Sequence, residues 1–282
     1  MRVFVLTSSL TGWASVCLPY LVRDPGIEIA LVLYSEGQQP RPWLARWRRA
    51  RKAARLGILG SLVGIHLRPW FSTDVRDLLH PEPIDQLAER NGIRFERTPS
   101  INCGRTVEIV TECGADLGLC LGNGYVGPGV FTVPRYGMIN VHHEMLPEFR
   151  GAHSAIWQIY VGSRETGYTI HQIDRHLDTG AILWKEAVPI DLQPTLRETT
   201  SRSVARLYTI SAEKLAHVVR DYPAWAARAT PQGEGHTYTT PTYPQYRRMV
   251  RRHRDWYRAA QDDLVPAHRT GVGVERAKQS NR

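Results

Sequence analysis

Three polar residues between Ile139 and Leu183 have the side-chain types that an acyl transfer requires. Asn140 and His142 are two positions apart in strand-like sequence, so their side chains would point to the same face of a strand. Asp178 lies in the turn sequence His-Leu-Asp-Thr-Gly, where the backbone can bend toward a site. An amide and a protonated imidazole can donate hydrogen bonds to a tetrahedral oxyanion, and a carboxylate can accept a proton. Together they suffice for acyl transfer without a covalent intermediate.

The elements that would position these residues alternate between strands and helices. Strands are expected over 2–7, 27–33, 94–98, 115–121, 138–142, 167–173 and 181–190. A first helix is expected to follow residue 12 and end at about 22, and further helices are expected over 84–91, 104–112, 152–162 and 196–222. This order predicts an α/β fold with a doubly wound, mostly parallel, Rossmann-like sheet. In such sheets sites form beyond the carboxyl ends of strands, so 8–12, 122–127 and the Asn140–His142 pair should meet at one crevice.

Several further elements follow in one order: Asn140-Val-His142, Leu146-Pro147, Arg150-Gly151, Thr166-Gly167-Tyr-Thr169-Ile170 and Asp178-Thr-Gly180. This pattern resembles the folate-dependent formyltransferases, whose members formylate methionyl-tRNA, glycinamide ribonucleotide or nucleotide-linked amino sugars. The resemblance implies the formyltransferase fold, 10-formyltetrahydrofolate as the cofactor, and catalytic roles for Asn140, His142 and Asp178. In that chemistry Asn140 and His142 stabilise the oxyanion, and Asp178 helps to remove the proton of the attacking amine.

The same resemblance implies two segments that face the pterin of the cofactor. One contains Leu121, Gly122, Tyr125 and Val126, although relatives have a more aliphatic run ending in proline where this chain has Asn-Gly-Tyr-Val-Gly. The other is a loop with Asp174 and His176, which would fold over the pterin largely through backbone groups. Ordinary turn residues are the alternative for this loop.

Residues for the acceptor are expected after the first strand. Exposed amides and the helix dipole suit a phosphate at Ser8, Ser9, Thr11 and Gly12, and an ordinary Ser/Thr helix cap is the alternative. The loop is not G-x-G-x-x-G or a P-loop, which argues against nicotinamide binding. His143 is expected to line the crevice or to contact substrate.

Positive charge is concentrated in two segments of this 282-residue chain, whose formal net charge is +9. Residues 41–55 hold seven basic residues and no acid, and residues 247–258 hold six arginines and one acid. Such clusters suit tRNA, a nucleotide diphosphate or an anionic membrane, or they are solvated helix faces. Residues 37–73 form a basic and apolar insertion that could be a buried hairpin of helices, a lid, a dimer surface or a membrane-surface patch.

The expected organisation is a catalytic domain over 1–222, a small extension over 223–260 and a disordered tail over 261–282. The tyrosine and proline run at 237–246 is unsuited to a long helix and could form a hairpin that stacks on a base or sugar, or could pack across the catalytic domain. No apolar run is long enough for stable membrane insertion, and no signal peptide is evident, so a cytoplasmic protein is expected. The four cysteines have no C-x-x-C spacing and no accompanying histidine cluster, so no metal site is expected. The cysteines are expected to be reduced thiols.

The acceptor amine is left open between hypotheses. The compact C-terminal region favours a nucleotide-linked amino sugar, whose product would feed lipopolysaccharide, O-antigen or a natural-product glycan. The basic insertion favours methionyl-tRNA instead, although its hydrophobic half looks buried. A catalytically silent relative that only binds a nucleotide is a third reading, against which the joint presence of Asn140, His142 and Asp178 argues. Partners would therefore be the sugar nucleotide or, less favoured, tRNA, with a homodimer as a further option.

Overall fold

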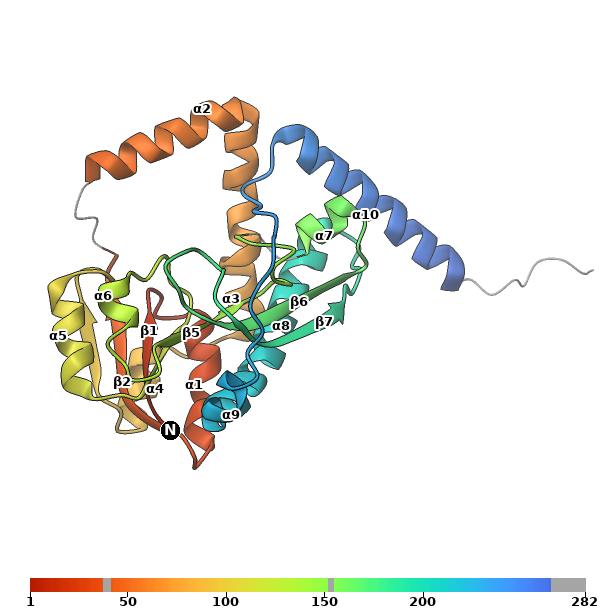
Figure 1. Ribbon diagram of the computed structural model, residues 1–282. Helices are drawn as coiled ribbons and strands as arrows, with labels where there is room; N and C mark the ends of the chain where they lie inside the picture. Colours follow the sequence, from red (N-terminus) through yellow and green to blue (C-terminus); the bar gives the residue numbers. More distant parts are fainter. Residues whose placement is uncertain (38–41, 152–154, 265–282) are drawn as a thin grey trace, which may run out of the picture.

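A seven-stranded sheet forms the centre of the protein, whose computed structural model describes residues 1–37, 42–151 and 155–264 (Figure 1). Its order is β3-β2-β1-β4-β5-β6-β7. The four pairs among the first five strands are parallel, and β5–β6 and β6–β7 are antiparallel. The strands are β1 (Arg2–Thr7), β2 (Glu28–Ser35), β3 (Phe95–Thr98), β4 (Leu117–Cys120), β5 (Met138–His142), β6 (Glu165–Gln172) and β7 (Ile182–Pro189). The predicted α/β fold with a mostly parallel sheet is confirmed.

Helices cover both faces of this sheet because its central strands are apolar on both sides. Val3 and Val5 of β1 enter a core with α1, α4 and α8, whereas Phe4 and Leu6 enter a second core with α5 and α6. The helical elements are α1 (Trp13–Arg23), α2 (Pro42–Leu67), η1 (Arg68–Phe71), α3 (Thr73–Leu79), α4 (Ile84–Arg90), α5 (Gly104–Cys113), α6 (Pro128–Phe131), α7 (Ile156–Val161), α8 (Leu196–Arg220), α9 (Tyr222–Ala226) and α10 (Tyr243–Leu264).

Helix α8 begins where its sequence supplies a capping box. The Thr195 hydroxyl accepts from the backbone amide of Glu198, and the Glu198 carboxylate accepts from the amide of Thr195. The helix ends at Arg220, and α9 begins at Tyr222, so the expected single helix over 196–222 is slightly shorter. Its buried side packs on α1, which fixes one wall of the crevice described below.

The insertion folds as two helices joined at a sharp kink, here labelled together as α2, and not as a buried hairpin. Gly57 has non-helical backbone angles (φ 67°, ψ 179°) inside α2, and the half before it extends away from the sheet (Figure 1). Val63 and Leu67 pack with Trp70 and α10, but Ile58 on the opposite side is 83% exposed. The interpretation of the hydrophobic half as buried is therefore wrong for its outer side.

The segment after residue 222 packs against earlier parts of the chain. Isolated β-bridges join Arg150 to Thr237 and Ile182 to Thr230, and Tyr238 packs between Phe149 and Trp157. The alternative in which the tyrosine and proline run packs across the domain is the one observed for Tyr238. Residues 261–264, expected to be disordered, belong to α10, and the rest of that expected tail lies outside the described residues.

Candidate active site

Adjacent antiparallel strands bring the polar residues of the site together. On β5, Asn140 and His142 are partly buried and point to one face, as the alternation of the strand predicts. On β6, His171 is the register partner of Asn140. The loop after β6 returns Asp178 to the same place, so that its carboxylate lies between the two imidazoles.

The distances show which of these groups are already hydrogen-bonded. The His142 Nε2–H donates to the carbonyl of Phe149 at 2.9 Å, because a carbonyl can only accept. Nδ1 of His142 therefore faces Asp178 Oδ2, 3.8 Å away. Asp178 Oδ1 lies 3.8 Å from Nε2 of His171. Both separations exceed a direct hydrogen bond and leave the carboxylate available to a ligand or a bridging water.

His171 is held neutral at the back of the site. Burial, with a smaller contribution from the nearby charge of His142, lowers the pKa of His171 to about 4, although Asp178 opposes the shift. Its Nδ1–H donates to the carbonyl of Gln172 at 2.8 Å, so Nε2 carries the lone pair. Nε2 then accepts from the Asn140 amide nitrogen at 3.3 Å, which fixes the side on which the NH2 group of Asn140 lies.

The loop that carries Asp178 makes a sharp turn, and this turn requires a glycine at position 180. Asp178 itself has φ of 54°, in the left-handed region that aspartate tolerates better than most residues. A Cβ on Gly180 would lie 1.9 Å from the carbonyl oxygen of Gln172, so only glycine fits there. The amide of Gly151 donates to Asp178 Oδ2 at 3.2 Å, and the side-chain amide of Gln232 donates to the carbonyl of Gly180 at 2.7 Å. The turn is therefore held from both sides.

His143 points away from the pair on β5 and into the wall of the crevice. Its ring lies edge-on to Trp13, with centroids 4.7 Å apart, and 4.5 Å from the ring of Tyr208. Burial, and then the charge of His142, lowers the pKa of His143 to about 3. A neutral imidazole in an aromatic wall favours the expectation that His143 lines the crevice over polar contact with a substrate.

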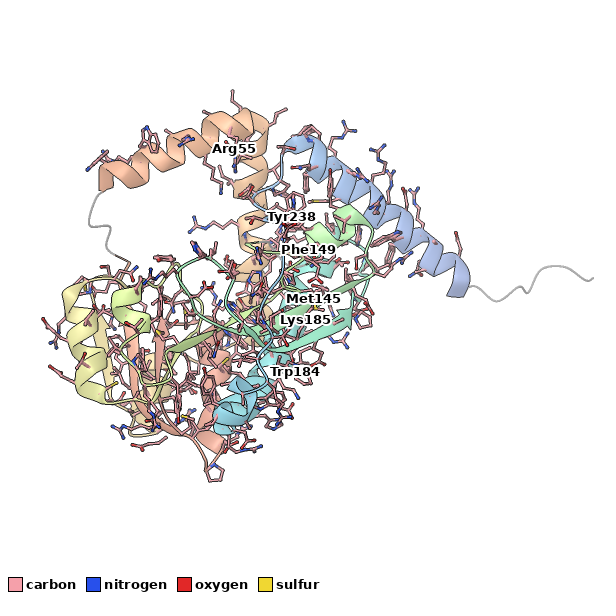
Figure 2. All side chains as sticks on the ribbon, viewed as in Figure 1. Arg55, Met145, Phe149, Trp184, Lys185 and Tyr238 are labelled. Atoms are coloured by element: carbon pink, nitrogen blue, oxygen red, sulfur yellow. The ribbon has the colours of Figure 1, made fainter. Side chains whose placement is uncertain are left out.

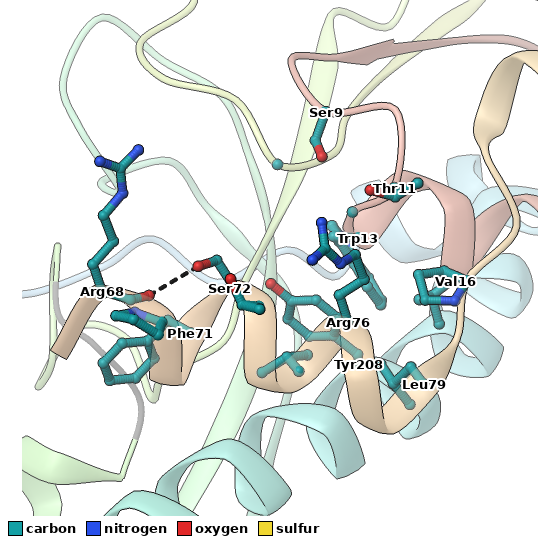
Figure 3. A pocket seen from close by; sticks show the side chains of 16 residues that line it. Ser9, Thr11, Trp13, Val16, Arg68, Phe71, Ser72, Arg76, Leu79 and Tyr208 are labelled. Carbon is teal, nitrogen blue, oxygen red and sulfur yellow. Dashed lines mark hydrogen bonds between the residues drawn. The ribbon is translucent and has the colours of Figure 1, made fainter. Parts of the chain in front are cut away.

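Two adjoining cavities meet at the site. The smaller has a volume of about 320 Å³ and is lined by Asn140, His142, Asp178 and Leu177 among others. The larger, of about 530 Å³, is lined by Ser9, Thr11 and Gly12 on one side and by Arg68 and Arg76 on the other (Figure 3). The walls of both cavities include Trp13, Phe71, Gly122 and Tyr208. The three segments expected to converge on one crevice do converge.

Only some of the residues expected to face the cofactor lie at these cavities. Gly122 lines both cavities, whereas Leu121 and Val126 are buried in the two cores of the sheet. The hydroxyl of Tyr125 donates to the carbonyl of Arg175 at 3.3 Å, which ties the two expected pterin-facing loops together.

In the second of these loops, Asp174 accepts from the backbone amide of His176 and from the hydroxyl of Thr179. The side chain of Asp174 therefore stabilises the turn, and His176 is exposed. Contact with the pterin through backbone groups stays a prediction. Leu177, which the sequence did not single out, is the side chain of this loop that lines the smaller cavity.

The residues expected to hold the acceptor fall into two groups. Ser9, Thr11 and Gly12 line the larger cavity, but the hydroxyl of Ser8 donates to Asn123 at 2.8 Å and ties two loops together. Gly12 is the N-cap of α1, and no side chain caps this helix. The alternative of an ordinary Ser/Thr cap is therefore not observed. A Cβ on Gly12 would lie 2.8 Å from the side chain of Ser9, so the turn needs glycine.

The sequence matches a known family over the part that carries this geometry. Residues 89–210 match the family model described as Formyl transferase, and this range contains Asn140, His142, His171 and Asp178. Over this range, which is less than half of the chain, the sequence is similar to formyl transferases.

Curated formyltransferases are similar to this chain over part of their length. The methionyl-tRNA formyltransferase of Aromatoleum aromaticum is 36% identical over 162 residues, which are 57% of this chain and 50% of that protein. The methionyl-tRNA formyltransferase of Synechocystis sp. is 32% identical over 184 residues, which are 64% of this chain and 53% of that protein. The chain thus spans about half the length of the curated relatives it matches.

Solved formyltransferase structures share the fold. Glycinamide ribonucleotide transformylase 1 from Symbiobacterium toebii superposes with a TM-score of 0.55 at 17% identity, covering 83% of this chain and 92% of its own. A sugar N-formyltransferase from Shewanella sp. superposes with a TM-score of 0.51 at 14% identity, covering 90% of this chain and 87% of its own. At these identities the superpositions establish the formyltransferase fold and no more.

Besides Leu177, three residues that shape the crevice were not anticipated. His171 lay in an expected strand, but only the antiparallel register of β6 on β5 shows that it faces Asn140. Arg68 and Arg76 follow the apolar half of the insertion, and their position at the crevice depends on how η1 and α3 pack on α8. All four cysteines are free thiols, and no group of three or more His, Cys, Asp or Glu in the described residues could hold a metal ion.

Proposed function

We propose that this protein transfers a formyl group from 10-formyltetrahydrofolate to the amine of a nucleotide-linked amino sugar. The observation that carries the proposal is the junction of the two cavities. The smaller contains groups suited to acyl transfer, and the larger contains groups suited to an anion. An acceptor with an amine at one end and a diphosphate at the other would occupy both.

In the smaller cavity each residue has one chemical task. Asn140 donates from its amide to the formyl oxygen as negative charge develops there, and His171 keeps the amide turned for this. His142, whose Nε2–H is bonded to the carbonyl of Phe149, stabilises the same oxyanion by donating from Nδ1 when that nitrogen is protonated. The Asp178 carboxylate accepts the proton that the acceptor amine loses, directly or through water. The bond between the formyl carbon and the folate nitrogen breaks, and that nitrogen takes up the proton.

The donor would supply only the formyl group, so the chain must hold its flat ring system. Leu177, which is 56% exposed, and the backbone of Gly122 line the smaller cavity from two loops. Tyr125 bridges these loops at the side of the crevice. An apolar side chain opposite exposed backbone groups suits a pterin, which presents an apolar face and a hydrogen-bonding edge. A solved sugar 3N-formyl transferase, determined with dTDP and 5-N-formyl-THF, shares this fold with a TM-score of 0.51.

The larger cavity favours a diphosphate because its lining is basic and contains no acidic residue. Arg68 has no acidic partner within the described part of the chain, and the neighbour of Arg76, Asp77, is exposed and 3.7 Å away. Figure 3 shows the guanidinium of Arg76 reaching toward the loop with Ser9 and Thr11, with Arg68 beyond Ser72. Arg76, near the N-terminus of α1, and Arg68, farther along the same cavity, can each neutralise a phosphate.

Methionyl-tRNA is the second candidate acceptor. Curated relatives at 32–36% identity are named methionyl-tRNA formyltransferases, and Arg46, Arg51, Lys52 and Arg55 of α2 are exposed. The exposed outer side of α2 also removes the objection that the insertion is buried. The amino sugar remains the first candidate because Arg68 and Arg76 place the positive charge inside a cavity next to the reacting groups.

An acceptor screen tests the proposal. Purified protein would be incubated with 10-formyltetrahydrofolate and dTDP-, UDP- or GDP-linked amino sugars, or with charged initiator tRNA, and products would be identified by mass spectrometry. Formylation of a sugar nucleotide is expected. Turnover with tRNA alone would replace the first candidate with the second. Binding of a sugar nucleotide without any turnover would indicate a relative that has lost catalysis.

A further inference from the structure

The outer side of α2 carries apolar side chains that no described part of the chain covers. Ile58, Leu62 and Ile65 follow the spacing i, i+4, i+7 and so lie along one side of the helix, here called the outer stripe. Their exposed fractions are 83%, 54% and 70%, and the adjacent Leu59 is 55% exposed. A run of exposed isoleucine and leucine marks an interaction surface, since scattered single exposure is the norm elsewhere.

The half of α2 before the kink carries exposed tryptophan and positive charge of its own. Trp43 and Trp47 are separated by one helical turn and are 65% and 54% exposed. Arg51 lies 5.3 Å from the ring of Trp47, and Lys52 is exposed beside it. Indole rings next to basic side chains are typical of helices that lie in the headgroup region of a membrane.

The inner side of α2 is already occupied, so the outer side is the face presented to a partner. Val63 and Leu67 are buried against η1 and α10. A Cβ on Gly64 would lie 3.1 Å from the methyl group of Thr240, which shows how closely the C-terminal segment passes beneath the helix. At the bend, Arg55 donates to the hydroxyl of Thr239 at 3.3 Å (Figure 2).

Charge distinguishes between the occupants that this surface could take. Residues 37–73 contain eight basic residues and no acidic residue. A second copy of the chain would bring these like charges together. A nucleic acid would satisfy the basic residues but would leave the outer stripe facing phosphates. An anionic lipid surface satisfies both, because its phosphates attract the cations and its acyl region accepts the apolar side chains.

We propose that α2 docks this protein on an anionic membrane surface. Trp43, Trp47 and the outer stripe lie at the boundary between headgroups and acyl chains, and Arg51 and Lys52 contact lipid phosphates. The described residues contain no helix long and apolar enough to cross a membrane, so the attachment is peripheral. This inference goes beyond the proposed formyl transfer and is independent of which amine is the acceptor.

Sedimentation of the full chain with lipid vesicles tests the docking. The protein should bind phosphatidylcholine vesicles that contain phosphatidylglycerol and should bind pure phosphatidylcholine far less, with binding that weakens as salt is raised. Because each basic residue near such a surface strengthens binding by about fivefold, Arg51→Glu with Lys52→Glu should weaken it by at least about twentyfold. Ile58→Ser, Leu62→Ser and Ile65→Ser together should weaken it by at least about tenfold.

Matched control variants distinguish docking through α2 from unspecific binding of basic or apolar side chains to vesicles. The control for the charge reversal is Arg247→Glu with Arg251→Glu, two exposed arginines of α10, a helix that has as many basic residues as α2. The control for the outer stripe is Leu78→Ser, Val161→Ser and Val250→Ser, three exposed apolar residues elsewhere. Each control should retain vesicle binding to within about twofold of the unsubstituted chain. Circular dichroism would verify that every variant is folded.

Three outcomes would overturn the proposal. The first is equal loss of binding in α2 variants and controls, which would mean unspecific attraction. The second is absence of binding to anionic vesicles together with a dimer, seen by analytical ultracentrifugation, that the outer-stripe variant dissociates; a second copy would then be the occupant. The third is absence of vesicle binding together with RNA binding that Arg51→Glu and Lys52→Glu abolish.

Discussion

His171 accepts a hydrogen bond from the amide of Asn140 across the β5–β6 strand pair, and burial keeps the imidazole neutral so that it can accept. The orientation of the Asn140 amide is therefore set by His171. A terminal amide can rotate by half a turn, which would exchange its donor for its acceptor. The lone pair of His171 holds the donor in place.

Replacing His171 by phenylalanine should lower kcat by roughly 10–100-fold, because the ring would fill the space but could not hold the amide. KM for the acceptor should change little, since His171 does not reach the larger cavity. Steady-state kinetics with the accepted substrate measures both constants. A variant that raises KM and leaves kcat unchanged would refute the positioning role.

Removing the reacting groups themselves should have larger effects. His142→Ala and Asp178→Ala should each abolish measurable turnover, and Asn140→Ala should lower kcat by about 100–1000-fold, as for the loss of one oxyanion donor. All three side chains lie at the cavity wall, so the fold should persist in circular dichroism spectra. Near-normal turnover in His142→Ala or Asp178→Ala would contradict the assigned chemistry.

The free energy of unfolding should fall as the pH decreases from about 6.5 to about 4. An unfolded histidine titrates near ~6.5, whereas burial lowers the pKa of folded His171 to about 4. Between these values the unfolded chain binds a proton at His171 that the folded chain does not, which costs up to about 1.4 kcal/mol per pH unit. His143, whose pKa burial lowers to about 3, adds a slope of the same sign, so replacement of His171 should reduce the slope without removing it. Urea denaturation at a series of pH values measures the slope, and His171→Gln should reduce it. The same slope in the variant and the unsubstituted protein would show that His171 is not the group involved.

Gly180→Ala should disrupt the loop that carries Asp178. The added methyl group would overlap the carbonyl oxygen of Gln172, so the turn must open, at a cost of roughly 1–3 kcal/mol in the free energy of unfolding. Turnover should fall as Asp178 moves. Gly129→Ala is the matched control, because a Cβ there meets open space and its backbone is not left-handed. Denaturant titration and kinetics of both variants provide the comparison, and equal stability of the two would contradict the steric account.

Arg68→Ala and Arg76→Ala should each raise KM for the acceptor by about 10-fold or more, since each removes a charged hydrogen bond to phosphate. KM for the formyl donor should be unchanged, because neither arginine lines the smaller cavity. Arg247→Ala on α10 is the control for loss of positive charge alone. Equal increases in KM for donor and acceptor would place these arginines outside the acceptor site.

Local patterns predicted the strands that carry the chemistry. The expected bounds of β1 and β5 match the structure, and alternation along β5 correctly put Asn140 and His142 on one face. Both are short, largely apolar segments beside turn sequences, so nearby residues determine them. The partner of Asn140 could not be found in this way, because it depends on the register of a strand that begins some 25 residues later.

For the insertion at 37–73 the sequence did not predict burial correctly. Its apolar residues predicted burial, but helical spacing alone does not say whether an apolar side faces a core or a surface left open for a partner. Val63 and Ile58 belong to one apolar run, yet Val63 is buried and Ile58 is exposed. The position of Arg68 and Arg76 beside the crevice likewise follows from packing between η1, α3 and α8, which no local pattern encodes.

The β-bridge between Arg150 and Thr237, together with the bond from Gln232 to Gly180, bears on how such enzymes could be recombined. The segment that follows the catalytic domain clamps the loop of Asp178 from outside. A chimera that exchanged everything after residue 222 for the tail of a relative, in order to change the acceptor, would also release the loop that carries Asp178. A productive exchange would have to keep residues 230–238 with the parent core and place the junction closer to α10.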